Sequence, residues 1–296
     1  MKTTLILLCL ALFTLSCHDG ESNYDASGTF EADEIIISAE VSGTIEQFDV
    51  EEGTQLKENQ FLGWIDSTQL HLRKKQLLAQ IDAILSRRPQ IATQLASYRV
   101  QLENAEREMR RLQKLQEADA ATQKQVDDAT AQVAVIRRQM EAHRSSLDIS
   151  SQGLVSETLP LSAQVEQIDD QIGRSRIVNP VAGTVLQQYA EAHELVNPGK
   201  PLYKIADLSS LELRAYITGN QLPLLKLGQP VTVFVDNGSD GYKEYPGTVN
   251  WISSKAEFTP KTIQTKDERA DLVYAIGVDV RNDGYLKIGM YGEVIF

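Results

Sequence analysis

The chain has 296 residues, enough for two or three domains, so its organisation must be inferred from sequence patterns. It carries 41 acidic and 29 basic residues, and the formal charge of −12 argues against a nucleic-acid partner, because phosphate binding requires a basic surface. Of only two cysteines, Cys9 lies in the apolar N-terminal run, so the sequence excludes a disulfide framework or a cysteine-rich metal site in the remainder.

Residues 1–17 have the features of a secretory signal peptide: Lys2 precedes an apolar run that is too short to span a bilayer comfortably. The end of this segment resembles a bacterial lipobox, in which the cysteine is lipidated, although Thr14 and Leu15 depart from the usual residues. We therefore expect export, a lipid on Cys17, and a linker over residues 18–27. One acylated residue would tether the protein to a membrane surface without spanning it. The alternative is an ordinary cleaved signal in which Cys17 is incidental.

Two short β-rich stretches repeat one motif at an offset of 140 residues, so that VSGTIEQ at Val41 aligns with VAGTVLQ at Val181. Short alternations of β-branched residues, interrupted by Gly, Asn and Pro, predict short strands with tight turns. Each copy is too small to form a core by itself. We therefore expect residues 28–66 and 174–206 to be two halves of one β-sandwich.

The insertion between the copies, residues 67–173, has the heptad pattern of a coiled coil. Spacings alternate between four and three along Ile91, Leu95, Tyr98, Leu102, Ala105, Met109 and Leu112. The pattern resumes along Thr122, Val126, Ala129, Val133, Ile136, Met140, His143 and Leu147. This predicts an antiparallel helical hairpin with its tip near residues 116–122, projecting on the order of 40 Å.

Breaks at similar distances from the tip predict that both arms of this hairpin are jointed. Pro89 interrupts the outgoing arm, and Gly153 and Pro160 interrupt the returning one. A second, shorter coiled segment would then lie next to the sandwich, formed by Leu70, Leu77, Ile81 and Ile84 against Leu161, Val165, Ile168 and Ile172. The alternative is a simple bundle folded back onto the β-domain.

Residues 207–296 contain five β-rich runs separated by Gly, Pro, Asn and Asp: SLELRAYI, PVTVFVD, YPGTVNWIS, LVYAIGVDV and GMYGEVIF. This composition predicts a small closed or nearly closed β-barrel. The fold class is therefore multidomain α+β and elongated. Four scattered histidines offer no metal-ligand spacing, and neither a nucleophile elbow nor a phosphate loop occurs, so we expect no enzyme activity, metal or cofactor.

The repeated motif resembles a biotinyl/lipoyl domain, split as in the haemolysin-D-type periplasmic adaptors, also called membrane fusion proteins. The second copy opens with IVNPVAG, which fits the family's usual apolar residue, Pro and Gly before the first strand. The resemblance implies that Gly43, Gly53, Pro180 and Gly183 are structural residues of the two lipoyl-like halves. A biotin or lipoyl carrier would present a modified lysine between the halves. Here Asp66-Ser67-Thr68 and the insertion occupy that place, so a carrier function is disfavoured.

The sequence RRLQKLQEADAATQKQVDDA resembles the hairpin-tip motif through which such adaptors contact a TolC-like outer-membrane channel. The resemblance implies a contact surface formed by Arg111, Leu112, Leu115, Gln116, Ala121, Thr122 and Asp127. Thr122 replaces the usual serine, and Ala121 stands where a bulkier aliphatic residue is common. Alternatively, Leu115 supports the helix end and Thr122 is the N-cap of the returning helix. The two interpretations are compatible.

The segment from Ala256 to Ile276 resembles adaptors that serve ABC-type exporters, and a chain that ends with its barrel is also typical of them. Charged residues between Lys261 and Arg269 either contact the transporter or form a solvated loop. The resemblance implies a lipid-anchored periplasmic adaptor, assembled as a hexamer, that links an inner-membrane exporter to an outer-membrane channel in a tripartite efflux or secretion system. The alternative is a coiled-coil envelope scaffold that is not involved in transport.

Overall fold

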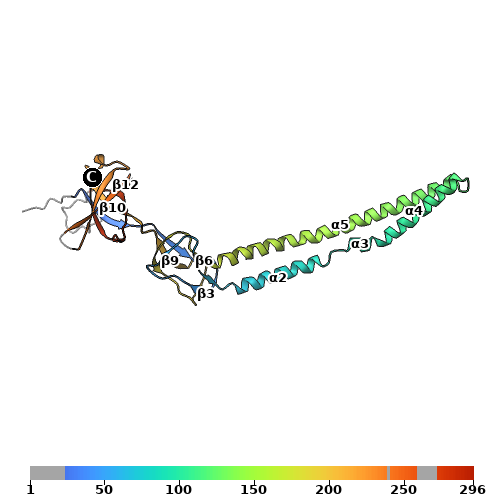
Figure 1. Ribbon diagram of the computed structural model, residues 1–296, viewed down its shortest axis with the longest axis horizontal. Coiled ribbons are helices and arrows are strands. Elements are labelled where there is room, and N and C mark those ends of the chain that lie inside the picture. Colours follow the sequence, from blue (N-terminus) through green and yellow to red (C-terminus); the bar gives the residue numbers. More distant parts are fainter. Residues whose placement is uncertain (1–23, 239–240, 259–271) are drawn as a thin grey trace, which may run out of the picture.

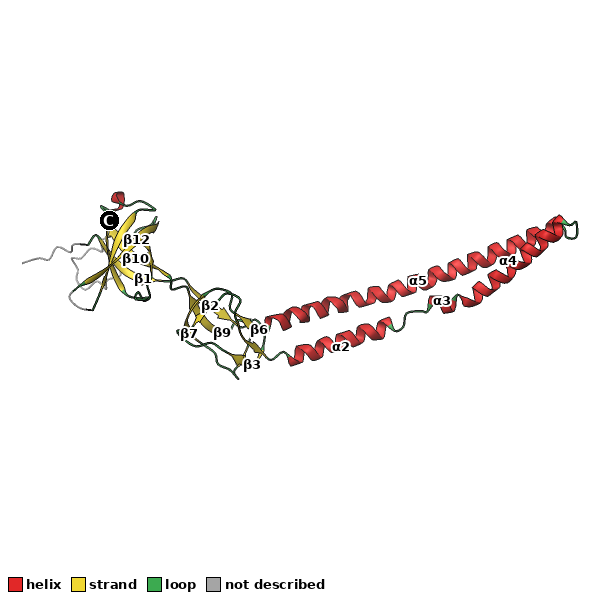
Figure 2. Ribbon diagram, viewed as in Figure 1, coloured by secondary structure: helices red, strands yellow, loops and turns green. Residues whose placement is uncertain are grey.

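The computed structural model describes residues 24–238, 241–258 and 272–296. It shows an elongated molecule in which a β-barrel, a β-sandwich and a helical hairpin follow one another (Figure 1). The predicted fold class is confirmed, and the hairpin extends away from the sandwich instead of folding back onto it (Figure 2). Cys17 and the charged segment 261–269 lie outside the described residues.

The sandwich interleaves the two copies of the repeated motif. The first copy contributes β2 (Glu34–Ser38), β3 (Gly43–Phe48), β4 (Gln55–Leu56) and β5 (Phe61–Ile65). The second contributes β6 (Arg176–Val178), β7 (Gly183–Gln188), β8 (Leu195–Val196) and β9 (Pro201–Ala206). One sheet has the order β2-β9-β7-β4 and the other β6-β5-β3-β8. Each sheet takes two strands from each copy, so neither copy can form a complete sheet alone.

The turns of the two copies also correspond. Gly53 has a φ of 82°, and its N–H donates to the Val185 carbonyl at 2.8 Å. His193, which is 140 residues later, has a φ of 71°, and its N–H donates to the Ile45 carbonyl at 2.7 Å. The turn therefore requires the left-handed conformation in both copies, and only the first copy supplies glycine, the residue that adopts it without strain.

Glycine is required at a second pair of equivalent positions, where β3 and β7 begin. A Cβ atom on Gly43 would lie 2.7 Å from the Asp66 carbonyl oxygen, and one on Gly183 would lie 2.6 Å from that of Ala206. Pro180 is exposed beside the buried Asn179. The Asn179 amide donates to the Lys57 and Val181 carbonyls and accepts from the Tyr203 hydroxyl at 2.9 Å, so it links the two copies.

The hairpin consists of an interrupted outgoing arm and a continuous returning arm. The outgoing arm comprises α2 (Thr68–Leu85), α3 (Ile91–Gln94) and α4 (Ala96–Glu117), whereas the returning arm is the single 52-residue helix α5 (Gln123–Arg174). At 1.5 Å per residue, α5 is about 78 Å long. That is about twice the projection expected from the distal seam alone, because α5 also continues along α2.

The predicted break at Gly153 and Pro160 is therefore wrong (Figure 2). A helix-interior proline removes one hydrogen bond and crowds the carbonyl four residues earlier, at a cost of about 3 kcal/mol. Pro160 is exposed, and α5 packs on both sides of it, with Leu147 and Ile168 buried. Packing along the whole hairpin thus opposes the local preference. Only the outgoing arm is jointed, around Pro89.

The predicted coiled-coil seam is present along both arms. Its members are buried or half-buried, except for the exposed Thr122 at the tip. The rings of Tyr98 and His143 lie 5.5 Å apart across the seam, so His143 packs on an aromatic neighbour. Arg137 also reaches Glu106 on the opposite helix at 2.9 Å.

The barrel is a closed ring of six strands. They are β1 (Ala26–Glu31), β10 (Ser210–Thr218), β11 (Pro230–Asp236), β12 (Tyr242–Ile252), β14 (Leu272–Arg281) and β15 (Tyr291–Ile295); the two-residue β13 (Glu257–Phe258) flanks β14. A short 3₁₀ turn, η1 (Leu222–Leu224), follows β10. The ring closes because β10 pairs with both β1 and β14.

The predicted boundaries of the first sandwich half are therefore corrected. Residues 26–31 form a barrel strand between β10 and β15, and the sandwich begins at Glu34. Phe30 is fully buried in the barrel core. The residue pattern of a six-residue strand is compatible with either domain. This strand belongs to the barrel because it fills the gap between β10 and β15.

Candidate functional site at the hairpin tip

The tip is a short turn closed by backbone hydrogen bonds at the end of α4. The Ala120 N–H donates to the Leu115 carbonyl at 2.7 Å, and the Asp119 N–H donates to the Gln116 carbonyl at 2.9 Å. This is the hydrogen-bond pattern of a Schellman motif, whose residue after the C-cap is left-handed and usually glycine. Here that residue is Asp119, with a φ of 54°. The turn is therefore well defined although it contains no glycine.

Thr122 caps the returning helix. Its Oγ1 accepts from the Gln125 N–H at 3.3 Å, while the Gln125 side chain accepts from the Thr122 N–H at 2.8 Å. Together these bonds form a capping box. The N-cap interpretation of Thr122 is thus confirmed, and the side chain remains exposed. A contact with another molecule is compatible with this role, because the hydroxyl oxygen can accept a second hydrogen bond.

The remaining tip residues proposed from the sequence divide into two groups. Leu112, Leu115 and Ala121 are half-buried against the hairpin. A polar chain crosses between the helices: Gln116 donates to Gln123 at 2.5 Å, and Gln123 donates to Asp127 at 2.8 Å. Gln123 was not among the residues proposed from the sequence, because only the returning helix brings it opposite Gln116.

Arg111 is not part of this polar chain. It forms a bidentate pair with Glu108, at 2.9 and 2.7 Å, one turn earlier on the same helix. The hydrogen bond raises the pKa of Arg111 and lowers that of Glu108. Both side chains are at least half exposed, so the pair contributes little to stability. The spacing of three residues between Glu108 and Arg111 could have indicated this pair from the sequence.

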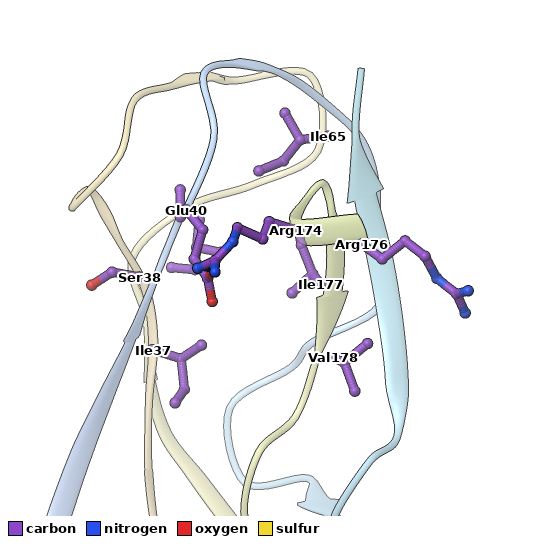
Figure 3. Close-up of a pocket in the computed structure, with 10 residues that line it drawn as sticks. Ile37, Ser38, Glu40, Ile65, Arg174, Arg176, Ile177 and Val178 are labelled. Carbon is purple, nitrogen blue, oxygen red and sulfur yellow. Dashed lines mark hydrogen bonds and ion pairs between the residues drawn. The ribbon is translucent and has the colours of Figure 1, made fainter. Parts of the chain in front are cut away.

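The hairpin is joined to the sandwich by almost no loop. Only Ser175 separates α5 from β6, and its hydroxyl donates to the Ile172 carbonyl at 2.6 Å. Arg174 forms ion pairs with Glu40 at 2.7 Å and with Asp170 at 2.8 Å. Figure 3 shows Arg174 directed toward Glu40, beside a small cavity of about 50 Å³, whereas Arg176 points away from it. The hairpin therefore continues into the sandwich through a single residue, and the exposed ion pairs of Arg174 add little to the stability of this joint.

The other arm starts where a carrier domain would present its lysine. The Asp66 carboxylate accepts from the Thr68 N–H at 2.9 Å and from the Thr68 hydroxyl at 2.6 Å, so it satisfies the first backbone N–H of α2, whose N-cap is Ser67. These hydrogen bonds lower the pKa of Asp66. The position between the two lipoyl-like halves thus holds a helix start, which argues against a carrier function.

Among the described residues, no three His, Cys, Asp or Glu side chains are grouped so that they could hold a metal ion. No helix in the described ranges is long and apolar enough to cross a membrane.

Comparisons with known proteins give the fold and the family. MacA from Actinobacillus actinomycetemcomitans superposes with a TM-score of 0.55 at 22% identity, covering 91% of this chain and 76% of MacA. The membrane fusion protein Spr0693 from Streptococcus pneumoniae R6 gives a TM-score of 0.54 at 18% identity, with coverages of 91% and 96%. At these identities the similarity shows the shared fold.

Two relatives match along nearly the whole sequence. A "UPF0194 membrane protein in asrC 5′region" of Acidithiobacillus ferridurans is 25% identical over 95% of this chain and 89% of its own. A UPF0194 membrane protein of Yersinia pseudotuberculosis is 26% identical over 98% and 96%. The model of the family described as "RND MFP, barrel-sandwich hybrid domain" matches residues 33–208, which include both sandwich halves and the hairpin between them. This match covers more than half of the chain, which therefore belongs to the membrane fusion protein family of periplasmic adaptors.

Proposed function

We propose that this protein is the periplasmic adaptor of a tripartite export system, anchored through Cys17 to the inner membrane, with its hairpin tip in contact with a TolC-like outer-membrane channel. Its role is non-enzymatic: it would join an exporter to a channel and enclose the path between them. The observation that carries this proposal is the long hairpin, whose returning arm joins the sandwich through Ser175 alone and which holds a polar tip far from the barrel (Figure 1).

The N-terminal end of the described chain supports anchoring on the barrel side. Tyr24 packs against Phe234 and Tyr242 on the barrel, with ring centroids 5.4 and 5.5 Å away. Six residues lie between Cys17 and Tyr24, so seven Cα–Cα steps join them. A fully extended chain of that length reaches about 24 Å. A lipid on Cys17 would therefore keep the barrel close to the membrane surface and direct the tip away from it.

The transporter class is proposed from the sequence of the segment at 256–276, which resembles adaptors of ABC exporters; residues 259–271 of it lie outside the described ranges. The description of the matching family model names RND pumps instead. Crosslinking from the barrel, for example from the exposed Tyr291, distinguishes an ABC exporter from an RND pump, because the captured membrane protein can be identified.

A ring of six copies is proposed because one narrow hairpin cannot enclose a channel. A closed ring requires a head-to-tail interface, in which two different surfaces of each copy meet. Cells that carry a photo-crosslinker on the sandwich should then yield a ladder of adaptor oligomers that ends at six. A ladder that ends at two would contradict the ring.

The central experiment is photo-crosslinking in cells from position 116, at the tip. The expected product is an adduct with an outer-membrane channel protein, identified by mass spectrometry. A matched control carries the same crosslinker at Val100, which is exposed near the start of α4, far from the tip. Capture from both positions would indicate lateral association. Only self-crosslinks or soluble proteins from position 116, in cells with active export, would favour an envelope scaffold.

A further inference from the structure

The loop between β10 and β11 displays two leucines in a rigid frame. Leu224 and Leu227 are 65% and 67% exposed, whereas Leu225 between them is buried in the barrel core. The Gly228 N–H donates to the Val249 carbonyl at 2.8 Å, and the Lys226 N–H donates to the Gln229 side chain at 3.0 Å. The exposed leucines are therefore held in place by the loop. Their side chains contact solvent unless another surface buries them.

This loop lies at the end of the barrel that faces away from the sandwich. β1 leads into the sandwich and β10 comes from it, and the two pair antiparallel, with Ser27 opposite Tyr216. The start of β1 and the end of β10 are therefore together, at the far end. Gln221 also donates to the Asp25 carbonyl at 2.7 Å. The loop is thus bonded to the segment that leads back to Cys17.

The charge of this region differs from that of the rest of the chain. The sequence has 41 acidic residues, yet none lies between Glu212 and Asp236, where Arg214 and Lys226 are the charged residues. Anionic lipid headgroups repel carboxylates and attract lysine and arginine. Within residues 213–235 the loop thus offers two exposed leucines and one lysine to a lipid surface, and the nearby Asp25 carboxylate is bonded to the Phe296 N–H at 3.0 Å.

We infer that the loop formed by residues 219–229 inserts Leu224 and Leu227 into the surface of the membrane that carries the anchor. The inference rests on the proposed anchoring at Cys17, because two leucines alone bind lipid too weakly to hold the protein there. The lipid would supply attachment, and the loop would set the orientation of the barrel against the membrane.

The experiment uses the chain from residue 17 onward, in which Cys17 is the only thiol, coupled to a maleimide lipid in vesicles of phosphatidylethanolamine and phosphatidylglycerol. Trp64 and Trp251 are replaced by phenylalanine, and Leu227→Trp places a single fluorophore in the loop. Leu195→Trp is the matched control, because Leu195 is 69% exposed but belongs to the sandwich. Circular dichroism verifies that both variants fold.

With lipids brominated on their acyl chains, Leu227→Trp should show a blue shift and a loss of intensity, and Leu195→Trp should show neither. Burying a leucine changes an equilibrium constant by on the order of tenfold or more, so adding Leu224→Ser should lower the ratio of inserted to free loop by about tenfold. Equal quenching of both tryptophans, or quenching of neither, overturns the inference. In this experiment Cys17 is attached to the vesicle by the maleimide lipid. A native protein found without a lipid on Cys17 would therefore contradict the proposed anchor but would not change the quenching result.

Discussion

Substitutions of Thr122 can separate the two roles proposed for it at the hairpin tip. Thr122→Ala removes the capping bond to the Gln125 N–H, which costs about 1 kcal/mol at an N-cap. Thr122→Asn retains a good N-cap but lacks the hydroxyl. Thr122→Ser retains both. If channel contact requires the hydroxyl, export should decline in the Ala and Asn variants and persist in the Ser variant; if only the cap matters, Asn should also support export.

Hydrogen exchange measures the cap independently of export. A loss of about 1 kcal/mol corresponds to about a fivefold larger open population at the start of α5. The Gln125 amide should therefore exchange about fivefold faster in Thr122→Ala and at the unaltered rate in Thr122→Asn. Amides near Ile168, at the other end of α5, provide the internal control. Unaltered exchange in Thr122→Ala would refute the reasoning, because it would mean that the capping bond does not hold the tip.

Four further variants test the fold. Pro160→Ala should stabilise the hairpin by about 2 kcal/mol in urea unfolding followed at 222 nm, since about 3 kcal/mol from the restored helix outweighs about 1 kcal/mol from a freer unfolded chain; a lower midpoint would contradict this. His193→Gly should raise the free energy of unfolding and Gly53→Ala should lower it, each by about 1 kcal/mol and with a matching shift in Tm, because both positions are left-handed. The hydrogen bond from Lys243 lowers the pKa of Asp283 to about 2. The stabilisation that Asp283→Asn removes should thus be present above pH 4 and be lost as the pH falls through 2, and a difference from the unsubstituted protein that is as large at pH 2 as at pH 5 would disprove the pairing.

At the hairpin tip, some features of the candidate site can be predicted from local sequence patterns and others cannot. The spacing of residues around Thr122 indicates both a helix start and a resemblance to a channel-binding motif, because an N-cap depends on the few residues that follow it. The chain from Gln116 through Gln123 to Asp127 depends on two helices in register, and the pairing of Arg111 with Glu108 depends on rotamers. Neither follows from the resemblance.

The sequence by itself determined the features that depend on local periodicity. The heptad seam, the repeated β-motif and the β-rich C-terminal runs each follow from side-chain patterns over a few turns or strands, and the structure has all of them. These features depend on neighbours in the chain, so the fold class and the hairpin could be predicted before any contact was known.

Only the tertiary structure decided which distant segments pair. Residues 26–31 complete the barrel because a gap remains between β10 and β15, and the two copies of the sandwich exchange strands because neither can close a sheet alone. The helix α5 passes through Pro160 because packing on both sides opposes a local cost of about 3 kcal/mol. In each case the decisive energy comes from contacts between residues far apart in sequence, which no local pattern records.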